Sequence, residues 1–298
     1  MRAVDIFAGC GGMSLGFEQA GIDVVAAFDN WKPAADIYRA NFEHPMHEKD
    51  LCDEDAVEVI KALKPDVLMG GPPCQDYSIA GKREAGERAN LTIRFAEIVC
   101  GVKPKWVVFE NVYNIERFGT LPVMKAMLSE AGYGLTARIL DASRCGVPQA
   151  RKRFILVGHL GAENGFLDEA LEAGLAEKQL TVRDYLGDKL GTQYYYMHPR
   201  SYARRGVFSV DEPSATIRGI NRPIPENYRR HHGDAAAIED GVRALTAKER
   251  SYLQSFPESF KFEGAKTSVE LAIGNAVPPA LAKYVATCIV EYEDKLEE

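Results

Sequence analysis

Short apolar runs, each ended by glycine or a carboxylate, constrain the fold of this chain. Residues 2–8, 23–29, 66–69 and 107–112 are predicted to form buried strands. Helical patterns lie near residues 12–20, 31–41, 54–63, 91–99 and 121–131, and further strands are predicted at 135–140 and 154–158. Strands that alternate with helices predict an α/β fold with a mostly parallel sheet and helices on both faces. In such sheets, ligands bind at the carboxyl ends of the strands.

The loop at residues 70–78, Gly-Gly-Pro-Pro-Cys-Gln-Asp-Tyr-Ser, places a cysteine at one of these strand ends. Two glycines interrupt the strand, and Pro72 and Pro73 fix the backbone that follows. A free cysteine is most often a buried structural residue. Since a core cysteine needs neither a stiff loop nor polar neighbours, we predict that Cys74 is a nucleophile.

Charged side chains are predicted to reach the same edge of the sheet. Glu110 lies near the carboxyl end of the strand at 107–112, and beside Cys74 a general-acid role is predicted, with a helix N-cap or a surface carboxylate as the alternative. In an extended segment alternate residues face one side, which groups Gln149, Arg151 and Arg153. Two cations on one face suit a pyrimidine carbonyl and a nearby phosphate, and a solvated edge strand is the alternative.

A glycine-rich turn at residues 9–16 follows the first strand and opens a helix, where backbone amides can approach a ligand. Ser14 stands where the dinucleotide fingerprint G-x-G-x-x-G needs glycine, so a nicotinamide cofactor is disfavoured. Asp29, at the tip of the second strand, can accept hydrogen bonds from two ribose hydroxyls. Trp31 either faces an adenine ring or packs in the core of the helix that follows.

The charge distribution matters more than the total charge. The chain has 298 residues, enough for one large domain or two smaller ones, and its net charge is −7. A basic balance is the simple footprint of a nucleic-acid-binding protein. Residues 194–232, however, hold seven Arg, no Lys and three acidic residues. Arginines interleaved with Tyr and Gly favour a groove-facing surface, with solvated loops as the alternative.

Cysteine usage and hydropathy limit the remaining classes. The six cysteines show no C-x-x-C pair, so neither a metal site nor a disulfide framework is expected, and a reducing cytoplasm suits the chain. No apolar run approaches the roughly 20 residues of a membrane span, so no membrane partner is expected. The chain enters a strand at once, which leaves no room for a signal peptide.

Five motifs, in order between residues 5 and 286, resemble the DNA (cytosine-5)-methyltransferases of the prokaryotic or phage restriction-modification type. They are Asp-Ile-Phe-Ala-Gly-Cys-Gly-Gly at 5–12, Pro-Pro-Cys-Gln at 72–75, Phe-Glu-Asn-Val at 109–112, Gln-Ala-Arg-Lys-Arg at 149–153 and Gly-Asn-Ala-Val-Pro-Pro at 274–279. The family usually has Glu at the position of Asp29 and Phe at that of Tyr77. Single motifs are weak, but five in order are highly specific.

The resemblance implies a Rossmann-like methyltransferase fold that depends on S-adenosylmethionine, plus a smaller irregular target-recognition domain. The expected boundaries are 1–158 for the catalytic and cofactor-binding domain, 159–241 for the recognition domain and 242–298 for a segment that returns to the first. The implied activity is methylation of carbon 5 of a flipped-out cytosine in double-stranded DNA, leaving S-adenosylhomocysteine. A cognate restriction endonuclease, a monomeric state and a cytoplasmic, nucleoid-associated location are expected.

The resemblance also implies roles for single residues. Cys74 would add to carbon 6, Glu110 would protonate ring nitrogen 3, and Arg151 with Arg153 would complete the catalytic set. The cofactor-binding residues would be Phe7, Ala8, Gly9, Cys10, Gly11, Gly12, Asp29, Asn30, Trp31, Asp50, Leu51, Pro72, Leu91, Asn275 and Ala276. The DNA-binding residues would be Gln75, Ser78, Lys82, Arg83, Arg200, Arg204, Arg205, Arg218, Asn221 and Arg222.

Several alternatives remain at this point. Asp50 could instead cap the helix at 54–63. A transfer-RNA cytosine methyltransferase can share this architecture, although the Gln-Asp-Tyr-Ser continuation at 75–78 fits the DNA enzymes better. A non-catalytic nucleic-acid-binding relative would be expected to lack Cys74 or Glu110, and both are present.

Overall fold

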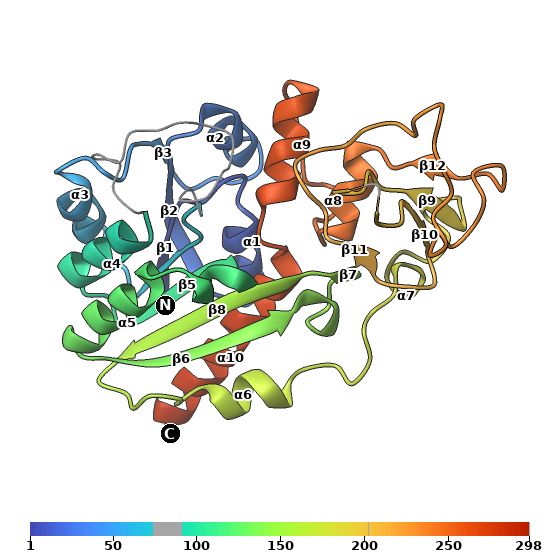
Figure 1. Cartoon of the computed structure of the whole chain (residues 1–298). Coiled ribbons are helices and arrows are strands. Elements are labelled where there is room, and N and C mark those ends of the chain that lie inside the picture. Colours follow the sequence, from blue (N-terminus) through green and yellow to red (C-terminus); the bar gives the residue numbers. More distant parts are fainter. Residues whose placement is uncertain (74–90, 202, 298) are drawn as a thin grey trace.

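The centre of the fold is a seven-stranded sheet with the order β3-β2-β1-β4-β5-β8-β6 (Figure 1). The computed structural model describes residues 1–73, 91–201 and 203–297. The strands are β1 (Arg2–Ile6), β2 (Asp23–Asp29), β3 (Met46–Glu48), β4 (Val67–Gly70), β5 (Trp106–Val112), β6 (Tyr133–Asp141) and β8 (Lys152–Leu160). Strands β1 to β5 pair in parallel, and β8 runs antiparallel to β5 and β6. The predicted mostly parallel sheet is confirmed.

Helices cover both faces of this sheet. One face carries α1 (Gly12–Gln19), α6 (Asp168–Ala173) and α10 (Pro279–Glu297), and the other carries α3 (Ala56–Ala62), α4 (Leu91–Val102) and α5 (Thr120–Glu130). Successive strand side chains point to opposite faces. In β5, Val108 packs in the first cluster and Val107 in the second. Burial on both faces explains why these strands are continuous apolar runs.

A second lobe is built of short strands, short helices and loops. Its small sheet has the order β10-β9-β12, and one further pair joins β11 to β7 of the first lobe. The elements are β7 (Gln149–Ala150), β9 (Tyr194–Tyr196), β10 (Val207–Ser209), β11 (Ser214–Ala215), β12 (Arg243–Ala244), α7 (Val182–Leu186), α8 (Ala247–Leu253) and α9 (Lys266–Asn275). Helix α2 (Lys32–Arg39) and the 3-10 turns Tyr113–Arg117 and Ala142–Arg144 complete the described elements.

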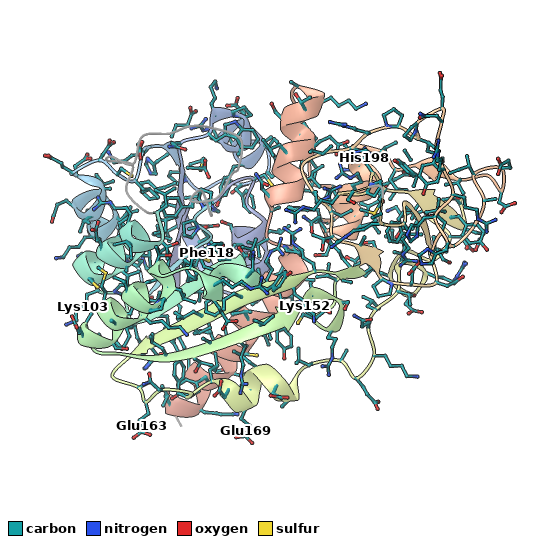
Figure 2. The ribbon with its side chains drawn as sticks, in the orientation of Figure 1. Lys103, Phe118, Lys152, Glu163, Glu169 and His198 are labelled. Atoms are coloured by element: carbon teal, nitrogen blue, oxygen red, sulfur yellow. The ribbon has the colours of Figure 1, made fainter. Side chains whose placement is uncertain are left out.

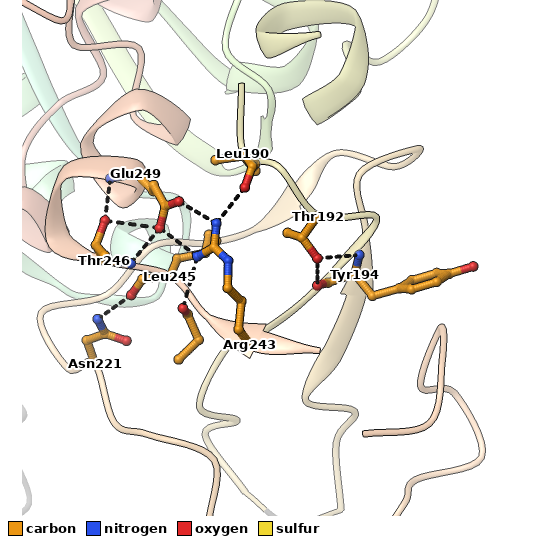
Figure 3. A network of polar contacts seen from close by, with 9 residues as sticks. Leu190, Thr192, Tyr194, Asn221, Arg243, Leu245, Thr246 and Glu249 are labelled. Atoms are coloured by element: carbon orange, nitrogen blue, oxygen red, sulfur yellow. Dashed lines mark hydrogen bonds and ion pairs between the residues drawn. The ribbon is translucent and has the colours of Figure 1, made fainter. Parts of the chain in front are cut away.

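The start of α8 is held as the sequence predicts. Thr246 accepts a hydrogen bond from the Glu249 amide, and Glu249 accepts one from the Thr246 amide, which forms a capping box. Arg243 also pairs with the Glu249 carboxylate and donates to the Leu190 carbonyl (Figure 3). The carboxylate therefore holds β12 and α8 together.

The helices at the C-terminal end of the chain pass between the two lobes. Residues 266–296 satisfy the length and hydropathy of a membrane span, and 61% of the tested window is buried inside the protein. A core helix passes the same test, and this segment is interrupted between α9 and α10. Helix α10 packs on the sheet through Leu281, Val285 and Ile289. The segment is therefore accounted for as core.

Helix α1 packs so closely on the C-terminal segment that glycine is needed at its first position. A Cβ atom on Gly12 would lie 2.0 Å from the carbonyl oxygen of Val277. We expect Gly12→Ala to lower the free energy of unfolding by about 1–3 kcal/mol, as overpacking does. Gly119→Ala is the matched control, since nothing lies within 4 Å of its Cβ position, and it should stay within about 1 kcal/mol of wild type. Urea unfolding of both variants tests this, and equal effects would contradict the packing argument.

Candidate active site

A cavity of about 900 Å³ opens at the carboxyl ends of the parallel strands. Most of the residues predicted to bind the cofactor line it: Phe7, Ala8, Gly9, Cys10, Asp29, Asn30, Trp31, Asp50, Leu51, Leu91, Asn275 and Ala276. Gly11, Gly12 and Pro72 do not line the cavity. Sequence reasoning missed Asp5, Met13, Lys49, Cys52, Gly71, Pro73, Leu271, Ala272 and Val277. Asp5 could have been found, because a charged residue inside an apolar strand is itself a signal.

Gly11, Gly12 and Pro72 instead support the segments around the cavity. Gly11 has a φ of 92° and precedes α1, and a Cβ there would clash with Phe42. Gly12 packs on the C-terminal segment, and the carbonyl of Pro72 accepts a hydrogen bond of 2.9 Å from the side-chain Nδ2 of Asn111. The glycine turn thus leaves room for a ligand by bringing backbone close to backbone.

Asp29 joins the glycine turn to the helix that follows β2. Its two carboxylate oxygens accept hydrogen bonds of 2.8 Å from the backbone amides of Gly9 and Trp31. Burial raises the pKa of Asp29, and the amides oppose that rise. Each carboxylate oxygen has a further acceptor site that could take a hydrogen bond from a ribose hydroxyl. Contact with ribose stays a prediction.

Trp31 and Asp50 each had a structural alternative to ligand binding, a core position for Trp31 and a helix cap for Asp50. Trp31 lines the cavity and also packs against the apolar cluster of the second lobe, and its contact with an adenine ring stays a prediction. Asp50 accepts a hydrogen bond from the Cys52 amide, while α3 begins after Asp55. Asp50 is therefore not the cap of α3, and its position on the cavity wall is consistent with the ligand-binding alternative.

Glu110 is the buried acid of the site. Its side chain lies on the cavity wall, and its Oε1 accepts an ion pair of 2.9 Å from Nε of Arg153. Burial raises the pKa of Glu110, although Arg153 and Arg151 oppose the rise. A Cβ on Gly71 would lie 3.0 Å from the Glu110 carboxyl, so the loop that leads to Cys74 passes directly beside the acid.

Arg151 does not occupy the position that the sequence suggests. Its side chain is only 2% exposed, and its guanidinium donates to the carbonyls of Ile217, Gly274 and Ala276. The alternation predicted for residues 149–153 is correct, since Gln149 and Arg151 are buried while Ala150 and Lys152 are exposed. The structure does not support the predicted contact between Arg151 and a pyrimidine carbonyl. Arg153, which pairs with Glu110, is better placed for it.

Some predicted residues lie outside the described part of the chain. Cys74, Gln75, Ser78, Lys82 and Arg83 fall in residues 74–90. Gly71 and Pro73 immediately before them line the cavity. Among the described residues, no group of three or more His, Cys, Asp or Glu is placed to hold a metal ion.

The predicted DNA-binding residues of the second lobe divide into two groups. Arg200, Arg204 and Arg222 are exposed. Arg218 is half-buried, and its burial lowers its pKa, as do the nearby charges of Arg200 and Arg204. His198, labelled in Figure 2, lies near Arg218 and Arg222, which also lower its pKa after burial does. These groups form one positive cluster in a chain that is acidic overall.

Arg205 and Asn221 belong to the second group, because they serve internal contacts. Arg205 pairs with Glu212 and lies 4.4 Å from the centre of the Phe208 ring. Asn221 donates to the Leu245 carbonyl and to the Glu270 carboxylate. Their predicted contacts with DNA are therefore not supported, since both side chains already stabilise the lobe.

A buried hydrogen-bonded chain runs from Asp5 at the cavity to the surface. Asp5 accepts a hydrogen bond of 2.6 Å from Ser14, and Ser14 accepts one of 2.7 Å from Tyr38. Tyr38 contacts His44, which lies 3.2 Å from Glu18. The other carboxyl oxygen of Asp5 has no partner among the described residues. Burial raises the pKa of Asp5 to about 7.

This raised pKa predicts a specific pH dependence of stability. The unfolded chain loses the Asp5 proton near pH 3.8 and the folded chain near pH 7, so Asp5 makes the protein less stable as pH rises through this window. As pH rises from 5.5 to 8, the difference in unfolding free energy between Asp5→Asn and wild type should therefore grow by about 2 kcal/mol in favour of the variant. Urea titrations at the two pH values measure this, with Asp23→Asn at an exposed position as control. Parallel pH profiles of wild type and Asp5→Asn would contradict it.

Comparisons with known proteins identify relatives of this chain. The model of the C-5 cytosine-specific DNA methylase family matches residues 1–291. Type II methyltransferase M.HindV of Haemophilus influenzae is 54% identical over 296 residues, which cover 98% of this chain and 97% of that protein. Type II methyltransferase M.HgiDI of Herpetosiphon aurantiacus is 53% identical over 294 residues, which cover 98% and 95%.

A solved structure supports the fold independently. The Dnmt2 methyltransferase of S. pombe superposes with a TM-score of 0.74 at 19% identity, over 100% of both chains. At that identity the similarity shows the fold alone. Together the matches confirm the predicted α/β methyltransferase fold and the predicted DNA (cytosine-5)-methyltransferase class. The chain therefore belongs to the C-5 cytosine-specific DNA methylase family.

Proposed function

We propose that the chain transfers a methyl group from S-adenosylmethionine to carbon 5 of a flipped-out cytosine within a short sequence of duplex DNA. The observation that carries the proposal is the buried Glu110 on the cavity wall, which pairs with Arg153 and lies beside the loop that leads to Cys74. The pair offers a proton donor and a fixed cation, which are the groups that recognition of a cytosine edge requires.

The cavity suits the cofactor. Its volume of about 900 Å³ lies in the range of small-molecule sites. Phe7, Trp31 and Leu91 would contact the adenine ring, while Asp29 would accept hydrogen bonds from the ribose and Asp50 one from the adenine amino group. Asn275 and Ala276 would close the opposite wall. When bound, S-adenosylmethionine supplies an electrophilic methyl group on a sulfonium.

The protein groups would act on the cytosine in a defined order. The thiolate of Cys74 forms a bond to carbon 6, and Glu110 donates a proton to nitrogen 3 while Arg153 binds the carbonyl oxygen. The resulting enamine forms the bond from carbon 5 to the methyl group, the bond between that methyl and the sulfonium sulfur would break, and S-adenosylhomocysteine would be the leaving group. A base, which we take to be water, then removes the proton at carbon 5. The bond between the Cys74 sulfur and carbon 6 breaks and the double bond between carbons 5 and 6 re-forms. Glu110 takes back its proton from nitrogen 3.

The DNA would lie against the positive cluster of the second lobe. Arg200, Arg204, Arg218 and Arg222 would bind phosphates, together with Lys82 and Arg83, while Gln75 and Ser78 would follow the nucleophile into the duplex. Flipping the base out of the duplex costs a few kcal/mol, which these contacts would offset. We assign target recognition to the part of residues 159–241 that lies in the second lobe, after a catalytic domain at 1–158. The segment at 242–298 begins in the second lobe with β12, α8 and α9 and returns to the main sheet through α10.

The biological setting follows from the restriction-modification type of the resemblance. A cognate restriction endonuclease would cut the same short target that this chain protects. We expect the chain to act as a monomer in the cytoplasm, on the DNA of the nucleoid.

Transfer of labelled methyl from S-adenosylmethionine to unmethylated duplex DNA tests the proposal. Transfer RNA runs in parallel, and Cys74→Ser is the control. Label on DNA cytosine that disappears in the variant supports the mechanism, and bisulfite mapping then identifies the target. Label on RNA alone would support a transfer-RNA enzyme instead. No label on either substrate, with the cofactor still bound, would contradict the proposed activity.

A further inference from the structure

Arg151 joins two segments that are far apart in the sequence. We call residues 218–222 the recognition loop. Nη1 of Arg151 donates a hydrogen bond of 2.9 Å to the carbonyl of Ile217, the residue that precedes this loop. Its Nη2 donates bonds of 3.1 Å to the carbonyls of Gly274 and Ala276. Ala276 lines the cavity. One guanidinium therefore binds the base of the recognition loop and the wall of the cofactor cavity.

The two segments also touch directly, so there is little slack between them. A Cβ on Gly274 would lie 2.1 Å from the Gly219 nitrogen and 2.2 Å from the carbonyl carbon of Arg218. Gly219 in turn lies against Leu271, another residue of the cavity wall. A shift of the recognition loop must therefore move the end of α9, where Asn275 and Ala276 face the cavity.

The surroundings of Arg151 keep it in this arrangement. Gln149 accepts a hydrogen bond of 2.8 Å from the Ile217 amide and donates one of 2.7 Å to Gln254. Gln254 donates to the Ile273 carbonyl. Both glutamines are fully buried. Polar groups buried in this way hold a defined geometry, because an unmade hydrogen bond is costly there.

We propose that Arg151 is a positioning residue that couples DNA binding at the recognition loop to cofactor binding at Asn275 and Ala276. The proposal rests on the proposed function and assigns Arg151 a role away from the cytosine. Coupling of this kind is reciprocal: DNA tightens the cofactor site by the same factor by which the cofactor tightens the DNA site.

The test measures the affinity for S-adenosylhomocysteine by calorimetry, without DNA and with sheared, unmethylated genomic duplex DNA at saturation. We expect DNA to tighten binding to wild type by about 5- to 150-fold, the usual range for coupled sites. In Arg151→Met this ratio should fall towards one. Arg151→Lys, which keeps the charge but has one donor nitrogen, should give an intermediate ratio and serves if the first variant does not fold.

Arg94→Met is the matched control. Arg94 also binds backbone carbonyls beside the cavity, those of Leu51 and Asp53, but on the wall away from the recognition loop. Its loss should weaken cofactor binding by the same factor with and without DNA, which leaves the ratio unchanged. A ratio that falls equally in both methionine variants would overturn the specific role of Arg151.

Kinetics separate the coupling role from contact with the base. Coupling predicts that Arg151→Met raises KM for the cofactor in the presence of DNA more than it lowers kcat. A large loss of kcat with an unchanged affinity ratio would return Arg151 to the cytosine and overturn the proposal, as would a wild-type ratio of one. Failure of the proposed function is distinct, because it appears as absent methyl transfer in wild type.

Discussion

Glu110→Gln is expected to lower kcat for methyl transfer by about 10²- to 10⁴-fold, the usual contribution of a general acid. The amide can still hydrogen-bond to the cytosine edge, but it has no acidic proton to place on nitrogen 3. Affinity for S-adenosylhomocysteine should change less than about threefold, since the loss falls on the transition state. Single-turnover rates together with calorimetry measure the two effects separately.

The pH dependence gives a second and independent readout of Glu110. Because burial raises the pKa of this carboxyl, the proton persists to a higher pH than on a free glutamate. The wild-type rate should fall as pH rises through that shifted pKa, and the residual rate of Glu110→Gln should not. Glu116→Gln, at an exposed position six residues on, is the matched control. A variant with near-normal kcat would exclude Glu110 as the acid.

The parts of the fold that the sequence predicts are those with a local signal. An apolar strand that ends in glycine or in an acidic residue can be recognised from a few consecutive residues. Strand β2, for example, has its predicted bounds, 23–29. The capping box of Thr246 and Glu249 is similarly local. Because parallel strands share one carboxyl edge, the local signals together also place the cavity and Glu110.

The partners of buried polar groups could not be predicted, because the sequence shows which face a residue occupies and not what covers that face. Arg151 shares its face with Gln149 as expected, yet its carbonyl partners are 66 to 125 residues away. Asparagine is a residue type that often contacts DNA, but Asn221 donates to the Leu245 carbonyl and to Glu270 on α9, a helix that the sequence did not reveal. The sequence of α9 shows no clear apolar stripe, because the charged residue Glu270 is buried together with its apolar residues.

Breaking the buried ion pair between Arg250 and Glu270 should have the largest effect on stability. The two side chains are 3% and 4% exposed, and Arg250 also donates to the carbonyl of Arg218. Glu270→Leu leaves a buried, unpaired cation and should cost about 3–5 kcal/mol of unfolding free energy. The double variant Arg250→Met with Glu270→Leu should recover most of that loss, because it removes both charges. Urea unfolding of wild type, both single variants and the double variant forms the cycle.

The same cycle separates stability from recognition. Arg250 holds the recognition loop through the carbonyls of Arg218 and Ile220, and Glu270 holds it through Asn221. The apolar double variant restores packing but none of these hydrogen bonds, so its affinity for duplex DNA should stay reduced while its stability returns. Affinity that recovers together with stability would mean that the pair only supports the fold. Affinity that stays low would show that buried ions in α8 and α9 are retained because they position the loop that meets DNA.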